Sequence, residues 1–268
     1  MADMMRRGLL GGALVAGALG VAGRASAQNA PQADPDAEKV QQALQGYNDP
    51  AALKVVPVGQ DWANLHRYHA ANATVAAWTQ DKRRVVFMGD SITDNWFNFE
   101  GDWFDANGLV GRGISGQTTA QMLVRFWPEV VKLNPQAVHI MAGTNDIAEN
   151  LDPYDQEATQ NNLEAMAAMA DANGIAVVMA SVPPATSFSW RPEVGNPHDK
   201  IVALNTWIQA MCNSHGLAYC DYWPVLANAD GGLKTELGIG GDSVHPSKDG
   251  YDLMQPLALT AIATALTA

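Results

Sequence analysis

Positive charge is scarce in this sequence. Sixteen Lys and Arg residues stand against 28 Asp and Glu, for a formal net charge of −12 at pH 7. No basic run or basic amphipathic helix offsets the acidic excess. Because such a surface repels phosphate backbones and anionic lipid headgroups, nucleic acid is excluded as a partner and neutral substrates are favoured over polyanions.

Cysteine is scarce too, and clustered metal ligands are absent. The two cysteines, Cys212 and Cys220, allow one disulfide bond in an exported protein. They are equally compatible with two core thiols, because a free cysteine packs as a small hydrophobe. His66 and His69 lie three residues apart on an expected helix without Cys, His or Asp neighbours in a cluster, which favours structural histidines over a metal site.

Long apolar runs are missing except near the amino terminus, where the pattern is typical of an export signal. Arg6 and Arg7 precede an uncharged apolar stretch, residues 8–23, and residues 25–27 form a small-residue cleavage signature. At about 16 residues the stretch is short for a membrane span. We predict cleavage before Gln28, export to the periplasm or medium, and no stable membrane insertion of the mature chain. An uncleaved anchor is the alternative, and the arginine pair also suits twin-arginine export.

Beyond the amino terminus, short apolar segments alternate with stretches of helical periodicity. The predicted strands are residues 85–88, 109–114, 137–141, 176–180 and 217–220. The predicted helices are residues 61–80, 118–132, 155–173, 199–214 and 251–266. This alternation implies βαβ units with right-handed crossovers. We therefore predict an α/β fold: a three-layer α/β/α sandwich with a central parallel five-stranded sheet, flavodoxin-like in topology.

The domain organisation follows from these two patterns. Residues 1–27 are the predicted signal peptide, and residues 28–59 form a leader with a short helix. Residues 60–268 are predicted to form a single α/β domain. No internal repeat or second domain is visible in the sequence.

Four polar segments lie where strands end or just before the last helix. They are Gly-Asp-Ser-Ile-Thr at 89–93, a Gly-rich segment at 113–119, Gly-Thr-Asn-Asp at 143–146 and Asp-Ser-Val-His-Pro at 242–246. In parallel sheets, function gathers at the carboxyl ends of the strands. A serine is a poor nucleophile without a base, and a histidine oriented by a carboxylate is the usual base.

These four segments, in this order, resemble the four blocks of the SGNH hydrolases, also called GDSL esterases and lipases. They look most like small bacterial acylhydrolases related to the catalytic subunits of platelet-activating-factor acetylhydrolase. The resemblance implies an SGNH hydrolase fold and a catalytic triad of Ser91, Asp242 and His245. It also implies an oxyanion hole made by the Ser91 N–H, the Gly116 N–H and the Asn145 side-chain amide. This chemistry requires no metal or organic cofactor.

Two details in and just before the Gly-rich segment, residues 111–119, bear on the resemblance to SGNH hydrolases. Many relatives have Asn where this chain has Gly111, a departure that affects no proposed catalytic residue. Residues 111–116 also match a dinucleotide-binding fingerprint. The match follows the second core strand rather than the first, and no lone acidic residue suited to a ribose follows, so a nucleotide site is disfavoured.

The position of each tryptophan in the sequence predicts whether it lines the substrate pocket or packs in the core. Trp96 follows Ser91 closely, and Trp190 and Arg191 lie in a long loop after the fourth strand, so these three residues are predicted to line the substrate pocket. Ordinary loop packing is the alternative. Helical spacing predicts core positions for four others: Trp62, Trp78, Trp127 and Trp207.

The predicted function is hydrolysis of short-chain acyl esters, acetyl above all, through an acyl-serine intermediate. The substrate is expected to be a small-molecule or glycan ester. An acyltransferase, or a lysophospholipase or thioesterase, using the same triad is the first alternative. A non-catalytic carbohydrate-binding relative is the second. The sequence does not determine the oligomeric state.

Overall fold

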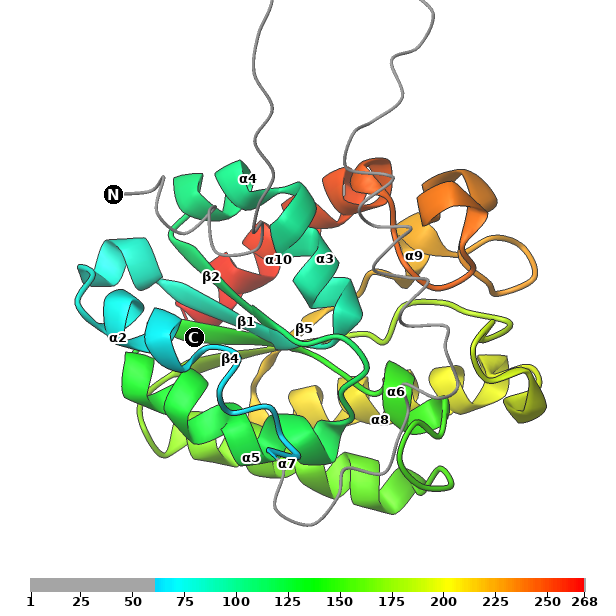
Figure 1. The fold of residues 1–268 in the computed structure, drawn as a ribbon, viewed down its shortest axis with the longest axis horizontal. Coiled ribbons are helices and arrows are strands. Elements are labelled where there is room, and N and C mark those ends of the chain that lie inside the picture. Colours follow the sequence, from blue (N-terminus) through cyan, green and yellow to red (C-terminus); the bar gives the residue numbers. More distant parts are fainter. Residues whose placement is uncertain (1–60, 268) are drawn as a thin grey trace, which may run out of the picture. The chain divides into compact units, whose positions relative to one another are not determined.

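The structure is a computed structural model that describes residues 61–267 (Figure 1). The predicted signal peptide, residues 1–27, and the leader, residues 28–59, lie outside the described residues and stay predictions. The helices and strands below therefore belong to the predicted catalytic domain.

A five-stranded sheet forms the middle of this domain, and every strand pair in it is parallel. The strands are β1 Val85–Gly89, β2 Leu109–Gly113, β3 Ala137–Met141, β4 Ala176–Ala180 and β5 Ala218–Cys220. Their order is β2-β1-β3-β4-β5, which is the flavodoxin-like order. The predicted α/β class and the parallel five-stranded sheet are confirmed.

Helices cover both faces of the sheet. The α-helices are α2 His69–Ala76, α3 Ser91–Phe99, α4 Gly101–Ala106, α5 Thr119–Glu129, α6 Thr144–Ile147, α7 Gln156–Asp171, α8 His198–His215, α9 Trp223–Leu226 and α10 Lys248–Ala265. The 3-10 helices are η2 Gln80–Arg83, η3 Val131–Leu133, η4 Pro192–Val194, η5 Thr235–Leu237 and η6 Ile239–Gly241. Helices α3, α4 and α10 pack on one face, and α5, α7 and α8 pack on the other (Figure 1).

The strands are mainly apolar because both faces of the sheet are covered, with Arg112 in β2 and His139 in β3 as buried polar exceptions. All five residues of β1, β2 and β3 are buried. Parallel sheets need this composition, since neither face meets water. The core therefore lies between sheet and helices, and polar chemistry is left to the ends of the strands.

The predicted helix over residues 61–80 is shorter in the structure, where helix α2 begins only at His69. Asp61 explains the late start: its Oδ2 accepts the His66 N–H at 2.8 Å and closes a turn. Asn64 follows with a φ of +54°, which no α-helix tolerates. Local side-chain bonding thus replaces the first helical turns.

Two of the four tryptophans assigned to the core are exposed. Trp62 is 39% exposed and Trp127, on the outer side of α5, is 48% exposed. Phe126 next to it is fully buried, so α5 turns that residue toward the sheet instead. Trp78 and Trp207 are partly buried against the core, as expected.

Cys212 and Cys220 are buried free thiols, which decides between the two alternatives for them. Burial raises the pKa of each thiol to about 12, so both stay protonated at neutral pH. They pack as small core residues, Cys212 in α8 and Cys220 at the end of β5.

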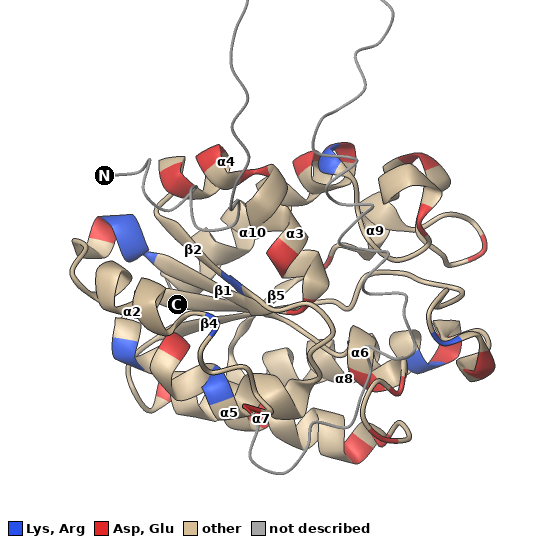
Figure 2. Cartoon of the chain, viewed as in Figure 1, with Lys and Arg blue, Asp and Glu red and all other residues tan. Residues whose placement is uncertain are grey.

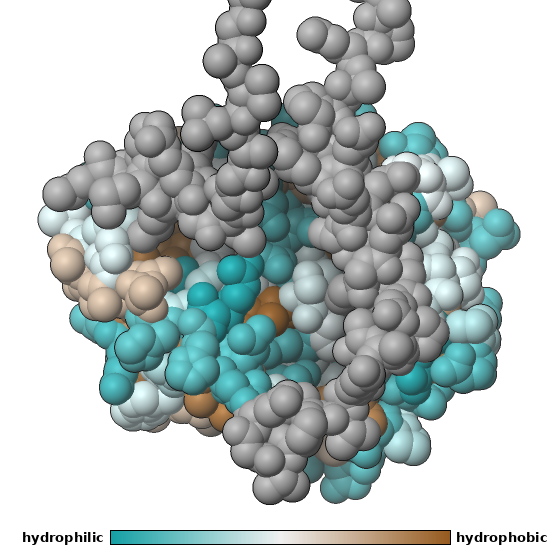
Figure 3. All heavy atoms as spheres, viewed as in Figure 1, coloured by the Kyte–Doolittle hydropathy of each residue, from teal (hydrophilic) through white to brown (hydrophobic). Residues whose placement is uncertain are grey.

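The surface carries more acid than base. Figure 2 shows Asp and Glu on helices of both layers, with fewer Lys and Arg between them. In the view of Figure 3 the described surface is mainly hydrophilic, with small separate apolar spots. Among residues 61–267, no helix combines the length and apolarity needed to cross a membrane.

Candidate active site

Ser91 lies where β1 turns into α3. Strand β1 ends at Gly89, Asp90 is the helix N-cap, and Ser91 is the first helical residue. The Asp90 carboxylate accepts the Ile92 N–H at 2.9 Å, which satisfies one of the free donors of the first turn. Only glycine fits at position 89, because a Cβ there would lie 2.0 Å from the Thr93 Oγ1.

His245 meets Ser91 from the other end of the chain. The Ser91 Oγ and the His245 Nε2 are 2.9 Å apart across a separation of 154 residues. Both side chains are buried. The loop that carries His245 is fixed by the Ile239 N–H, which donates to the His245 carbonyl at 3.0 Å. A serine and a histidine at this distance have the geometry of a nucleophile with its base.

Asp242 holds the other side of the imidazole. Its Oδ1 lies 3.3 Å from the His245 Nδ1 and accepts the N–H groups of Val244 at 2.6 Å and His245 at 2.8 Å. Burial alone would raise the pKa of Asp242, but the hydrogen bond and charge of His245, with the two backbone donors, hold it below its usual value. The carboxylate therefore stays ionised beside the ring and favours one tautomer.

Gly116 and Asn145 lie at the ends of the two strands beside β1. Gly116 has a φ of +79°, a conformation that favours glycine. Asn145 belongs to the short helix α6, which follows β3. The Asn145 Nδ2 donates to the Gln117 carbonyl at 3.0 Å and to the Asp90 Oδ2 at 3.3 Å. All three strand-end segments are thus bonded to one another beside Ser91.

Residues 87–253 match the family described as GDSL-like Lipase/Acylhydrolase. The chain belongs to this family. All the predicted catalytic and oxyanion residues fall inside the matched segment. The resemblance read from the four sequence blocks is therefore confirmed, and the chain is an ester-hydrolysing enzyme.

Solved structures of GDSL-like proteins support the assignment. A GDSL-like lipase from Bacteroides thetaiotaomicron is 41% identical, with a TM-score of 0.73 over 76% of this chain and 98% of its own. A candidate acylhydrolase from Bacteroides fragilis is 40% identical, with a TM-score of 0.74 over 77% and 99%. An acetylxylan esterase mutant from Geobacillus stearothermophilus is 17% identical (TM-score 0.53, 69% and 95%), a likeness of fold alone. No curated protein matches the chain.

Asn150 is a polar residue at this GDSL-like site that the sequence analysis did not single out. Its Nδ2 donates to the Asn145 Oδ1 at 2.7 Å and lies 3.3 Å from the Gly116 carbonyl. Its own Oδ1 accepts the Trp190 Nε1–H at 3.0 Å. This chain of bonds sets which way the Asn145 amide faces. No motif or periodicity marks Asn150, because its role depends on side-chain contacts across two loops.

The structure places the three predicted pocket residues, Trp96, Trp190 and Arg191, in different surroundings. Trp190 is buried beside the site, with its ring centroid 5.9 Å from that of His245. Arg191 instead bonds the Glu149 carbonyl and pairs with Glu193 at 3.1 Å, so it braces the loop.

The prediction for Trp96 is wrong, because its side chain is fully buried and lines no open pocket. It stacks between the rings of Trp103 at 5.4 Å and Tyr251 at 5.3 Å. Trp96 follows Ser91 closely along α3, but it lies on the side of the helix that faces the core. Sequence proximity to the serine did not specify that side.

Gly111 has a packing role in this GDSL-like protein. It lies within β2, where a Cβ would come 2.7 Å from the Phe97 ring. The departure from the Asn of many relatives therefore concerns how α3 packs on β2. Within residues 61–267, no group of three or more His, Cys, Asp or Glu is placed to bind a metal ion.

Proposed function

We propose that this enzyme hydrolyses short-chain acyl esters, acetyl above all, through an acyl-Ser91 intermediate. The observation that carries the proposal is the 2.9 Å contact between the Ser91 Oγ and the His245 Nε2, with Asp242 on the other imidazole nitrogen. A binding protein would have no need for this constellation, since it serves to remove a proton from a hydroxyl.

The chemistry follows from the positions of the three side chains. The His245 Nε2 takes the Ser91 proton as the Oγ attacks the ester carbonyl carbon, and the same proton then goes to the departing alkoxide. Water then attacks the acyl-serine carbonyl carbon as His245 takes one of its protons, and the acid leaves as His245 returns that proton to the Ser91 Oγ. The ionised Asp242 stabilises the imidazolium that forms twice in the cycle.

The negative oxygen of each tetrahedral intermediate needs donors that are already in place. We assign the backbone N–H groups of Ser91 and Gly116 and the Asn145 Nδ2 to this role. The contact of the Asn145 Nδ2 with Asp90, at 3.3 Å, is longer than its contact with the Gln117 carbonyl, at 3.0 Å, and it is the one that an oxyanion would replace. One such donor contributes about 3–4 kcal/mol to barrier lowering.

The preference for a short acyl group rests on what surrounds the serine. The Trp190 indole lies beside His245 and is anchored by its bond to Asn150, so it limits the room next to Ser91. The acidic chain suits a neutral ester, such as an acetylated sugar. An enzyme named for acetylated xylan has the same fold.

The test is hydrolysis of p-nitrophenyl acetate, butyrate, octanoate and palmitate by the protein and its Ser91→Ala variant. We expect acetate to give the highest kcat/KM and the variant to lose at least about 10⁴-fold. Ser214→Ala is the matched control, since that hydroxyl bonds its near neighbours at the end of α8, the Met211 carbonyl and the His215 Nδ1.

Each other outcome has a definite meaning. A preference for palmitate would replace the short-chain proposal with a lipid substrate. An alcohol or sugar that diverts the acyl group from free acid would show a transferase. Activity that survives Ser91→Ala would refute the assigned nucleophile.

A further inference from the structure

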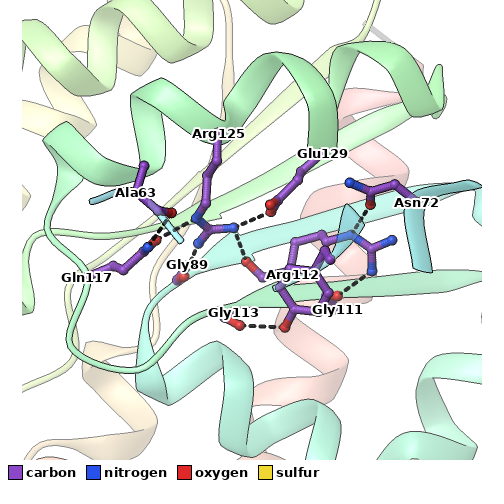
Figure 4. Close-up of polar contacts among 10 residues, drawn as sticks. Ala63, Asn72, Gly89, Gly111, Arg112, Gly113, Gln117, Arg125 and Glu129 are labelled. Atoms are coloured by element: carbon purple, nitrogen blue, oxygen red, sulfur yellow. Dashed lines mark hydrogen bonds and ion pairs between the residues drawn. The ribbon is translucent and has the colours of Figure 1, made fainter. Parts of the chain in front are cut away.

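A buried guanidinium lies behind the carboxyl ends of β1 and β2, apart from the proposed catalytic residues. Arg125, in α5, has no exposed surface. Its Nη2 donates to the Gly89 carbonyl at 2.8 Å and its Nη1 to the Arg112 carbonyl at 2.8 Å (Figure 4). Its Nε donates to the Gln117 Oε1 at 2.5 Å, and its Nη1 also pairs with Glu129 at 2.6 Å. One side chain thus joins α5 to three other segments.

Each of these three segments leads to a different part of the proposed site. Gly89 is two residues before Ser91. The second carbonyl belongs to β2, which runs into the turn that carries Gly116. Gln117 follows directly, and its carbonyl accepts the Asn145 Nδ2 at 3.0 Å. Arg125 therefore bonds the segments that lead to Ser91 and Gly116 directly, and it reaches the Asn145 segment through Gln117.

The strand ends are also held by α3, through contacts that exclude a Cβ. At Gly113 a Cβ would lie 2.1 Å from the Asp94 backbone N, and at Gly89 it would strike Thr93. The Tyr68 hydroxyl adds a 2.5 Å bond to the Gly113 carbonyl. With α3 and Arg125 both fixed against them, the ends of β1 and β2 have little freedom to move.

Stability alone is a poor reason for this arrangement. Burial raises the pKa of Glu129, and Arg125 offsets this only in part. Replacing a buried ion pair with apolar side chains of similar size is often neutral or stabilising. Besides its bond to Glu129, Arg125 makes three hydrogen bonds, and each goes to a segment that leads to the site. Placement explains this arrangement better, because catalysis is sensitive to small displacements of its groups.

We propose that Arg125 is a positioning residue for ester hydrolysis. It fixes the distance between the Ser91 Oγ and the donors at Gly116 and Asn145, without touching the substrate. This inference rests on the proposed function, because the distances it controls matter only if Ser91 carries the acyl group.

The experiment compares two changes at Arg125 with one change at a similar arginine elsewhere. Arg125→Lys keeps a charge beside Glu129 but loses the planar fork of donors. The double variant Arg125→Met/Glu129→Met removes the pair without leaving an unpaired charge. Arg83→Lys is the matched control, because the Arg83 side chain also bonds backbone carbonyls, those of Trp78, Leu133 and Asn134, at the opposite end of the sheet.

The readouts are kcat and KM for p-nitrophenyl acetate, the rate at which a p-nitrophenyl phosphonate modifies Ser91, and thermal unfolding. We expect Arg125→Lys to lower kcat about tenfold and the double variant about 100-fold, with KM within about threefold of wild type. Phosphonylation should slow in parallel, since it needs the same oxyanion donors. Arg83→Lys should change neither rate.

An Arg125→Lys protein that melts earlier yet keeps its kcat would overturn the proposal and leave Arg125 a purely structural role. If the double variant does not fold, Arg125→Lys decides, because its buried charge stays paired. A wild type with no Ser91-dependent activity would refute the proposed function and this inference together. A wild type that is active while both Arg125 variants match it would refute this inference alone.

Discussion

The two ends of the sheet use the same kind of bond for different purposes. At the amino end, Arg83 bonds the Trp78, Leu133 and Asn134 carbonyls from a partly exposed position. The partners in these bonds are backbone carbonyls. At the carboxyl end, Arg125 bonds carbonyls from full burial, and the bonding continues to Ser91's neighbours. Arginine side chains bond backbone carbonyls at both ends of the sheet. At the reactive end, the same arginine also bonds buried polar side chains, those of Gln117 and Glu129.

The helices contribute to the same contrast. Helix α3 presents its amino end, the positive end of its dipole, at the carboxyl edge of the sheet, and Ser91 is its first residue. Helix α8 instead ends at His215 next to the amino edge, so the negative end of its dipole faces that edge. An oxyanion is therefore favoured at one edge and disfavoured at the other.

The largest expected difference between the two ends comes from removing one side-chain amide donor at each. Asn145→Ala deletes the proposed side-chain donor to the oxyanion, so we expect kcat to fall about 10²–10³-fold with a small change in KM. Asn173→Ala is the matched control, because its amide bonds the Met169 carbonyl at the end of α7. Steady-state kinetics on p-nitrophenyl acetate measures both. Equal kcat values for the two variants would exclude Asn145 from the oxyanion hole.

A second difference concerns carboxyl groups. Burial raises the pKa of Asp90 to about 6, from a usual value of 3.8. The folded protein holds this proton more tightly than the unfolded chain, so ionisation of Asp90 weakens folding progressively between those pH values and the cost persists above them. At the amino end the exposed Asp81 has a lowered pKa, through its hydrogen bond with Thr79.

Asp90→Asn tests that difference. The amide can still accept the Ile92 N–H, but it carries no charge to bury. We compare the free energy of unfolding of the variant with that of wild type at each pH. Between pH 4 and pH 7 this difference should shift in favour of the variant by about 2–3 kcal/mol. Urea unfolding at several pH values measures this. Asp81→Asn should show no such gain, and parallel curves for Asp90→Asn and wild type would contradict the prediction.

The smallest expected effect concerns the orientation of the Asn145 amide. Trp190→Phe keeps an aromatic ring beside His245 but removes the N–H that bonds Asn150. The loss of one neutral hydrogen bond predicts a drop in kcat/KM of about three- to tenfold. Trp207→Phe, in α8, is the control. A Trp190→Phe enzyme with wild-type kinetics would show that Asn150 holds the amide without help.

Much of this arrangement was readable from the sequence, for physical reasons. Buried parallel strands are continuous apolar runs, so the five strands were predicted nearly residue by residue. The Ser91 block was visible because polar residues at the end of a strand interrupt that pattern, and the His245 block because its order and spacing fit the other three. Their meeting across 154 residues requires the loop before α10 to return to the carboxyl edge of the sheet, where β1 ends.

What was missed depends on side-chain direction rather than on pattern. Trp96 was placed at the pocket because distance along the chain says nothing about which side of a helix a residue occupies. Asn150 and Arg125 were overlooked because their partners come from other elements, through contacts that leave no periodic trace. The helix expected over residues 61–80 lost its first turns to a side-chain bond from Asp61, a local competitor that periodicity does not reveal.

The distance along the chain between Ser91 and His245 has a consequence for biosynthesis. A growing chain displays the serine early, but its base arrives only just before the last helix, α10. Until then the hydroxyl has no partner to accept its proton, so the nascent polypeptide is inert toward the esters around it. On the proposed mechanism, the order of the segments therefore delays activity until the loop that carries His245 has been made.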